Sequence, residues 1–296
     1  MPQSDKPQFA QFDKALVRRS FERAAHSYDA AAVLQHEVCR RMDERLDLIK
    51  HQPTIVLDAG SGTGNALAAL RARYPRARVI AFDLALGMLQ QGRTRTSQPW
   101  WKSILKQTLN EICGDIEHLP LATGSVDLIW SNLALQWVND PDRAFGEFHR
   151  VLVPGGLLMF STFGPDTLKE LRTAFAQVDR HTHVSRFIDL HDIGDILVKR
   201  GFADPVMDME PFTLTYSTVH ALMHDLKAIG AHNATQTRAP GLTGKSRLAA
   251  VTQAYETLRH DGKLPATYEV VYGHAWKPQP RLTASGKKII DIKPSR

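Results

Sequence analysis

Residues 54–64 read TIVLDAGSGTG, a short apolar run that leads directly into a loop with glycine at alternate positions. The apolar run predicts a buried strand, and NALAALRARY (65–74) after the loop predicts a helix. Gly60, Gly62 and Gly64 allow a sharp backbone turn and let a ligand approach without Cβ atoms in the way. A strand, a glycine loop and a helix in this order predict a ligand-binding turn of an α/β fold.

The chain beyond this loop alternates between strand and helix patterns. The alternating segments lie at 78–83, 84–97, 111–114, 126–132, 141–152 and 157–163, with strands at 78–83, 111–114, 126–132 and 157–163. Strands that alternate with helices predict a parallel sheet that is covered on both faces. Residues 14–50, before the first strand, have the apolar spacing of one or two amphipathic helices.

After residue 164 the pattern predicts mainly helices and two final strands. The helices are expected at 165–180, 189–200, 218–230 and 245–260, and the strands at 203–216 and 267–276. We expect these elements to extend the same domain, as the closing edge of its sheet and as a lid.

Polar side chains follow the next three predicted strands. Asp83 can accept hydrogen bonds from both hydroxyls of a ribose, although Asp also serves well as a helix N-cap. Asp115 suits the exocyclic amine of an adenine, with Ile116 packed on the ring; a plain turn residue is the alternative. Asn132 ends the fourth strand. The carboxyl ends of parallel strands are where ligands bind in open sheets, so these residues are candidates for one site.

These motifs resemble the class I S-adenosylmethionine-dependent methyltransferases over about residues 54–163. VLDAGSGTG (56–64), GDIEHLPL (114–121) and SNLALQW (131–137) carry the resemblance. It implies S-adenosyl-L-methionine as the cofactor. It also implies a Rossmann-like α/β fold, with a mostly parallel seven-stranded sheet, helices on both faces and an antiparallel C-terminal strand. By this resemblance, the cofactor would be contacted by Asp58, Gly60, Gly62, Gly64, Asp83, Leu84, Asp115, Ile116, Asn132 and Tyr28.

A longer resemblance, to the malonyl-[acyl-carrier protein] O-methyltransferases, covers nearly everything from 14 to 277. It rests mainly on FERAAHSYDAAAVLQHEV (21–38), STFGPDTLKELR (161–172) and DLKAIGAHNAT (225–235). It implies methyl transfer to the free carboxylate of a malonyl thioester, the step that opens biotin synthesis. The partner would be malonyl-acyl-carrier protein or malonyl-coenzyme A. Ser61 departs from the pattern, because many members have Cys there.

Methyl transfer to a carboxylate needs a cation beside the substrate rather than a general base. A carboxylate is already ionised at neutral pH, so no general base is expected. A buried carboxylate needs a counter-charge, and the planar fork of arginine matches its two oxygens. Arg186, in the VSRF stretch (184–187), is the first candidate anchor and Lys227 is the second. The alternative for both is a solvated surface cation.

Three segments are expected along the chain. These are an N-terminal helical segment 1–50 that closes over the cofactor, a methyltransferase domain 51–277 with helical lid insertions at about 164–200 and 218–262, and a basic flexible tail 278–296. The formal net charge of +6 permits an acidic partner without requiring nucleic acid. A nucleic-acid amine methyltransferase would usually place Asn/Asp-Pro-Pro-aromatic after the fourth strand, where this chain has Asn132-Leu133-Ala134-Leu135.

Composition bounds the remaining possibilities. Two cysteines make no disulfide framework and indicate free thiols in a reducing compartment, so we expect a cytoplasmic location. No apolar run approaches the roughly 18 residues of a membrane span. The thirteen histidines show no recognisable metal-ligand spacing, and no metal is expected.

Three other functions stay open at this point. The chain could methylate another small molecule, or hydroxylate arginine as a complex I assembly factor of similar appearance is thought to do. It could also sense S-adenosylmethionine without catalysis. Turnover of the cofactor with a malonyl thioester separates these alternatives.

Overall fold

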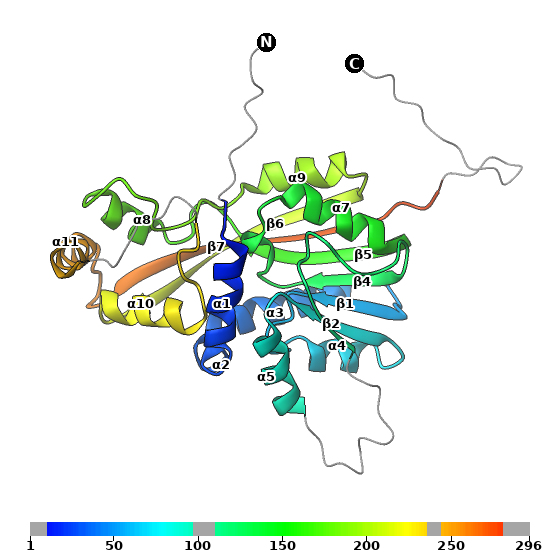
Figure 1. Ribbon diagram of the computed structural model, residues 1–296. Helices are drawn as coiled ribbons and strands as arrows, with labels where there is room; N and C mark the ends of the chain where they lie inside the picture. The colour runs from blue at the N-terminus through cyan, green and yellow to red at the C-terminus, as the bar shows by residue number, and fades with distance from the viewer. Residues whose placement is uncertain (1–10, 97–109, 236–243, 281–296) are drawn as a thin grey trace, which may run out of the picture.

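The computed structural model describes residues 11–96, 110–235 and 244–280, and its centre is a seven-stranded sheet (Figure 1). The strand order is β3-β2-β1-β4-β5-β7-β6. The strands are β1 (Ile55–Ala59), β2 (Arg78–Asp83), β3 (Asn110–Cys113), β4 (Val126–Ser131), β5 (Leu152–Phe163), β6 (Ala203–Tyr216) and β7 (Leu264–Trp276). The first five pair in parallel, and β7 runs antiparallel to both β5 and β6. The predicted mostly parallel sheet with an antiparallel C-terminal strand is confirmed.

Helices cover both faces of this sheet (Figure 1). They are α1 (Lys14–Ala24), α2 (Tyr28–Ala31), α3 (Val33–Arg45), α4 (Leu67–Arg73), α5 (Leu86–Thr96), α7 (Pro141–Val151), α8 (Lys169–Ala176), α9 (Leu190–Lys199), α10 (Val219–Ala228) and α11 (Lys245–Glu256). Two short 3-10 helices lie at Leu46–Leu48 and Leu135–Trp137. None of the helices in the described ranges is long and apolar enough to cross a membrane.

The core consists of one apolar layer on each face of the sheet. In β1, Val56 packs with α3 and α4 on one face, while Leu57 points to the layer of α7 and α9 on the other. This alternation follows from the period of two in a strand. Both side chains are fully buried, so β1 lies at the centre of the sheet and holds the glycine loop rigidly at its end.

The start of β5 differs from the expectation. The strand expected at 157–163 begins earlier, at Leu152, and runs through Pro154-Gly155-Gly156. Gly155 N donates to Lys277 O at 2.7 Å, and Lys277 N donates to Gly156 O at 2.9 Å. Pairing with the continuation of β7 therefore draws this stretch into the sheet, and the positive φ of Gly155, +80°, makes the bend possible.

The N-terminal segment lies along the residues that follow α10. Ser27 Oγ donates to Ala228 O at 2.9 Å, and Asp13 N donates to Ala234 O at 2.9 Å. Figure 1 shows α1 in front of the sheet, close to the end of α10. Of the basic tail expected at 278–296, all but residues 278–280 lies outside the described residues, as do residues 1–10 of the N-terminal segment.

Candidate active site

The glycine loop is held in a conformation that favours glycine at three positions. Gly60, Gly62 and Gly64 have φ values of +83°, +54° and +80°. A Cβ atom on Gly60 would collide with Cβ of Ala134, and one on Gly64 would come within 2.8 Å of Leu67 Cδ1. Gly60 and Gly64 are therefore required by the protein's own packing.

Gly62 differs from the other two glycines. Its Cβ atom would meet only Met88 Cε at 3.6 Å and Tyr28 Cε1 at 4.0 Å, both at ordinary van der Waals separation. The space above Gly62 thus opens into a cavity rather than into the protein. This is the place where a missing side chain leaves room for a ligand.

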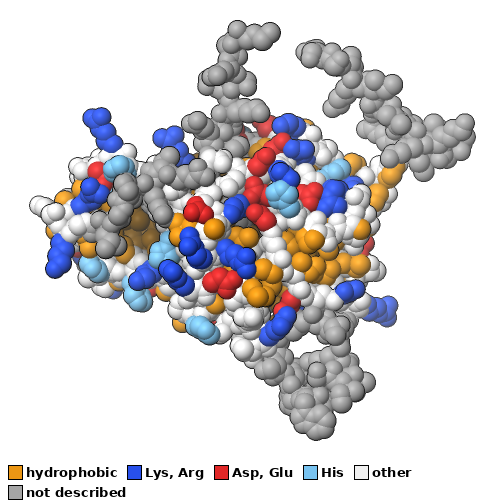
Figure 2. All heavy atoms as spheres, viewed as in Figure 1, with side chains coloured by type: hydrophobic (Ala, Val, Ile, Leu, Met, Phe, Trp, Pro, Cys, Tyr) orange, Lys and Arg blue, Asp and Glu red, His pale blue; other side chains and the backbone are white. Residues whose placement is uncertain are grey.

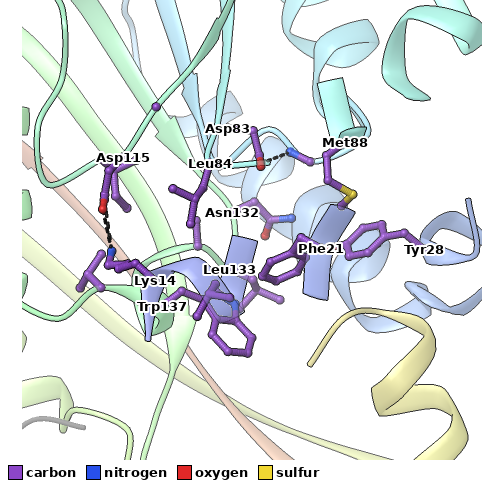
Figure 3. A pocket seen from close by; sticks show the side chains of 17 residues that line it. Lys14, Phe21, Tyr28, Asp83, Leu84, Met88, Asp115, Asn132, Leu133 and Trp137 are labelled. Atoms are coloured by element: carbon purple, nitrogen blue, oxygen red, sulfur yellow. Dashed lines mark hydrogen bonds and ion pairs between the residues drawn. The ribbon is translucent and has the colours of Figure 1, made fainter. Parts of the chain in front are cut away.

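Asp83 ties the end of β2 to the glycine loop. Its Oδ2 accepts from Gly62 N at 2.8 Å (Figure 3). Its Oδ1 accepts from Ala85 N at 2.8 Å. Burial raises the pKa of Asp83 to about 6, against the opposing effect of these backbone hydrogen bonds. A carboxylate oxygen has two acceptor positions, so each can accept one further hydrogen bond.

Asp115 lies at the other end of the cavity and meets a cation from α1. Lys14 Nζ is 3.1 Å from Asp115 and also pairs with Glu117 (Figure 3). Glu117 in turn accepts from Asn139 N and Asp140 N. The start of α1 is therefore fastened to the turn that follows β3.

Asn132 joins three elements at the end of β4. Its Oδ1 accepts from Ser161 Oγ at 2.9 Å, and its Nδ2 donates to Gln35 O at 3.0 Å. Its side chain therefore positions α3 against the sheet at the edge of the cavity.

The cavity bounded by these residues lies between α1 and the carboxyl ends of the strands. Of the residues predicted to contact the cofactor, those that line it are Tyr28, Gly60, Gly62, Asp83, Leu84, Asp115, Ile116 and Asn132. Asp58 and Gly64 lie behind this wall. Asp58 is buried, its Oδ2 has no hydrogen-bond partner in the described part of the chain, and burial together with Asp83 raises its pKa to about 8.

Sequence reasoning missed several residues of this wall. Lys14, Val17, Phe21, Met88, Leu133 and Trp137 also line it (Figure 3). Lys14 and Phe21 come from a helix that reaches the cavity only through tertiary packing. The position of Trp137 after β4, within the SNLALQW stretch, was a signal for the site.

A second cavity lies on the other side of Trp137. Its apolar wall includes Phe163, Leu171 and Tyr268, and its polar groups include Gln136, Ser185, His232 and Asn233. The ring of Trp137, which lines both cavities, packs against Phe12 at 5.7 Å and Phe21 at 5.3 Å between centroids. These aromatic side chains form the partition between the two cavities.

Neither of the two predicted anchors lines the first or the second cavity. Arg186 is exposed and lines a smaller cavity that shares Phe163 and Phe187 with the second one. Lys227 is exposed on α10 and is not part of the wall of either cavity.

A further arginine was missed by sequence reasoning. The pKa of Arg172 is lowered by burial and by the charge of Arg186, and its guanidinium donates to Pro165 O and Thr167 O at 2.9 Å. Within the described ranges, Arg172 Nε has no hydrogen-bond partner.

No group of three described His, Cys, Asp or Glu side chains is placed to hold a metal ion.

The comparisons with known proteins agree with this geometry. A family model described as a methyltransferase domain matches residues 57–160. Among solved structures, the YcgJ protein of Bacillus subtilis matches with a TM-score of 0.55 and 15% identity, over 80% of this chain and 98% of that one. The Haemonchus contortus phosphoethanolamine N-methyltransferase 2, in complex with S-adenosyl-L-methionine, matches with a TM-score of 0.51 and 16% identity. This match covers 87% of this chain and 57% of that one. At these identities the likeness shows the fold alone.

Curated proteins match much more closely. The malonyl-[acyl-carrier protein] O-methyltransferase of Gallionella capsiferriformans is 58% identical, over 94% of this chain and 96% of that protein. The protein of the same name from Laribacter hongkongensis is 57% identical, over 95% of this chain and 96% of that protein. With more than half of its residues identical over nearly its whole length, the chain belongs to the malonyl-[acyl-carrier protein] O-methyltransferase family.

Proposed function

We propose that this chain transfers a methyl group from S-adenosyl-L-methionine to the free carboxylate of a malonyl thioester carried on acyl-carrier protein. The product would be the malonyl methyl ester that starts biotin synthesis. The observation that carries the proposal is the pair of cavities that meet at Trp137. One cavity has the acceptors for a nucleoside, and the other has a mostly apolar wall that suits the chain of an acyl thioester.

The first cavity fits the cofactor residue by residue. The open space above Gly62 suits the amino-acid part of the cofactor, Asp83 suits the ribose, and Asp115 with Ile116 suits the adenine. When bound, S-adenosyl-L-methionine supplies a methyl group on a positively charged sulfur. Asp83 would accept from the ribose hydroxyls and so hold the cofactor in one orientation in the first cavity.

The second cavity supports the transfer by excluding water. Phe163 and Leu171 offer no hydrogen bonds to a carboxylate, which would raise its reactivity toward the methyl group. A carboxylate oxygen held about 3 Å from the methyl carbon, and in line with it, needs no general base. A C–O bond forms, the S–CH₃ bond breaks, and its electron pair stays on sulfur.

Arg186 is our first candidate to hold the carboxylate, across Phe187 from the second cavity. Lys227 is the second candidate, and it would need a movement of α10 to reach the substrate. Malonyl-coenzyme A carries the same thioester and is the alternative substrate. A cytoplasmic location goes with such carriers.

A methyl-transfer assay tests the proposal. The wild-type protein is incubated with S-adenosyl-L-methionine and, in turn, malonyl-, succinyl- and acetyl-[acyl-carrier protein]. We expect S-adenosylhomocysteine and a mass increase of one methylene on the malonyl thioester, with the acetyl thioester inert. A protein that binds the cofactor but methylates none of the three contradicts the proposed function.

A further inference from the structure

The residues after α10 form one side of the second cavity and pack against α1. Phe21 of α1 packs directly against Gly230, where a Cβ atom would come within 3.0 Å of Phe21 Cδ1. Ala231, His232 and Asn233 follow at once and line the cavity. The outer surface of α1 therefore lies beside this part of the cavity wall.

Three cations lie on these two helices. Arg19 and Arg23 are exposed, one helical turn apart on α1, and Lys227 is exposed near the end of α10. The pKa of His232 is lowered by its burial and then by the charges of Lys227 and Arg23. That effect places both charges close to a residue of the cavity wall. Figure 2 shows Lys and Arg side chains gathered over α1 and the end of α10 next to it.

These three cations lack the neutralisation seen elsewhere on the surface. Many other arginines of the described ranges have acidic partners, among them Arg40, Arg45, Arg73, Arg200 and Arg259. The neighbouring Arg18 lies 3.6 Å from Glu22. Within the described residues, no carboxylate lies within ion-pair distance of Arg19, Arg23 or Lys227. Their charge is available to a partner.

We propose that Arg19, Arg23 and Lys227, the cationic rim, dock the acidic surface of the carrier protein that delivers the malonyl thioester. The inference rests on the proposed function. A carrier whose flexible arm reaches into the second cavity must itself stand outside, and the rim lies beside one side of that cavity. Opposite charges on the two surfaces raise the association rate by about 10–10³-fold and fix the orientation of docking.

Charge reversal on α1 tests the rim. The double variant Arg19→Glu/Arg23→Glu is compared with wild type on malonyl-[acyl-carrier protein] and on malonyl-N-acetylcysteamine, a short thioester without a carrier. We expect kcat/KM for the carrier substrate to fall about tenfold or more, mainly through KM, with a weaker dependence on salt. Turnover of the short thioester should stay within about twofold of wild type, because Arg19 and Arg23 would touch only the carrier.

The control makes the same change of charge at the other end of the sheet. Lys50→Glu/Arg76→Glu alters two exposed cations before β1 and β2 and should leave the carrier substrate unaffected. Equal losses with both thioesters, or an equal loss with malonyl-coenzyme A, would overturn the docking of a carrier protein at the rim. Failure of the wild type to methylate even the short thioester would instead refute the proposed function.

Discussion

The Asn139 side chain pairs with both main-chain polar groups of Phe12, 127 positions earlier in the chain. Its Oδ1 accepts from Phe12 N at 2.7 Å, and its Nδ2 donates to Phe12 O at 3.1 Å. Phe12 also forms a β-bridge with Thr235 and packs against Trp137. The segment before α1 is thereby pinned between the two cavities, over the partition that separates them.

Breaking this pairing should loosen the cofactor cavity. Asn139→Ala removes two hydrogen bonds, each worth about 0.5–1.5 kcal/mol, so we expect S-adenosyl-L-methionine to dissociate about tenfold faster. Stopped-flow measurement of cofactor release checks this. Ser125→Ala removes a hydrogen bond to Ala122 O in the turn before β4 and serves as the control. Equal release rates in wild type and Asn139→Ala would show that the segment does not retain the cofactor.

Asp83→Ala should weaken cofactor binding by at least about tenfold. Hydrogen bonds to a charged group are worth roughly 1.5–3 kcal/mol each, and the ribose would lose two of them. Isothermal titration calorimetry on the folded variant measures the change. Unaltered affinity would rule out Asp83 as the ribose acceptor.

Because the pKa of Asp83 is raised, the affinity for the cofactor should also depend on pH. Because its pKa is about 6 in the folded protein, the carboxylate becomes protonated as the pH falls through 6 and loses an acceptor position. Affinity for S-adenosyl-L-methionine should therefore be constant near pH 8 and fall below pH 6, by up to about tenfold per unit. Asp83→Asn cannot titrate, so its weaker affinity should not change over this range.

Gly62 and Gly124 form a matched pair for testing the glycine loop. Both have positive φ, +54° and +63°, so alanine is strained at either position. A Cβ atom on Gly124 meets nothing within 4 Å, and Gly124 lies in a turn away from the cavity. We expect Gly62→Ala to lose most cofactor binding and Gly124→Ala to keep it, at similar melting temperatures. Similar cofactor affinities in both variants would show that the ligand does not occupy the space above Gly62.

Arg186 should matter for the substrate and not for the cofactor. An unpaired buried carboxylate costs about 3–5 kcal/mol, so Arg186→Ala should slow single-turnover methyl transfer by two to four orders of magnitude. Arg186→Lys keeps the charge but loses the fork, and its rate should lie between the two. Arg180, exposed in the same connection, is the control. A rate for Arg186→Ala within about threefold of wild type would move the anchor to Arg172 or Lys227.

Much of the fold follows from local patterns. The apolar runs that become β1, β2 and β4 end where the ligand-facing residues Asp83 and Asn132 begin, so the edge of the sheet could be predicted. The start of β5 could not, because it depends on pairing with Lys277, more than a hundred residues away. Lys14 likewise reaches Asp115 only through packing of α1, and no local periodicity contains that information.

The two cavities are lined by different segments of the chain, and this separation has an evolutionary consequence. The wall of the first cavity comes largely from α1, from the ends of β1, β2 and β4 and from the turn after β3, whereas the wall of the second cavity comes largely from 163–187, 226–233 and Tyr268. Substitutions in those later segments can reshape the acceptor cavity while Gly62 and Asp83 stay untouched. A lineage can therefore exchange one methyl acceptor for another through successive substitutions, while every intermediate keeps its ability to bind the methyl donor.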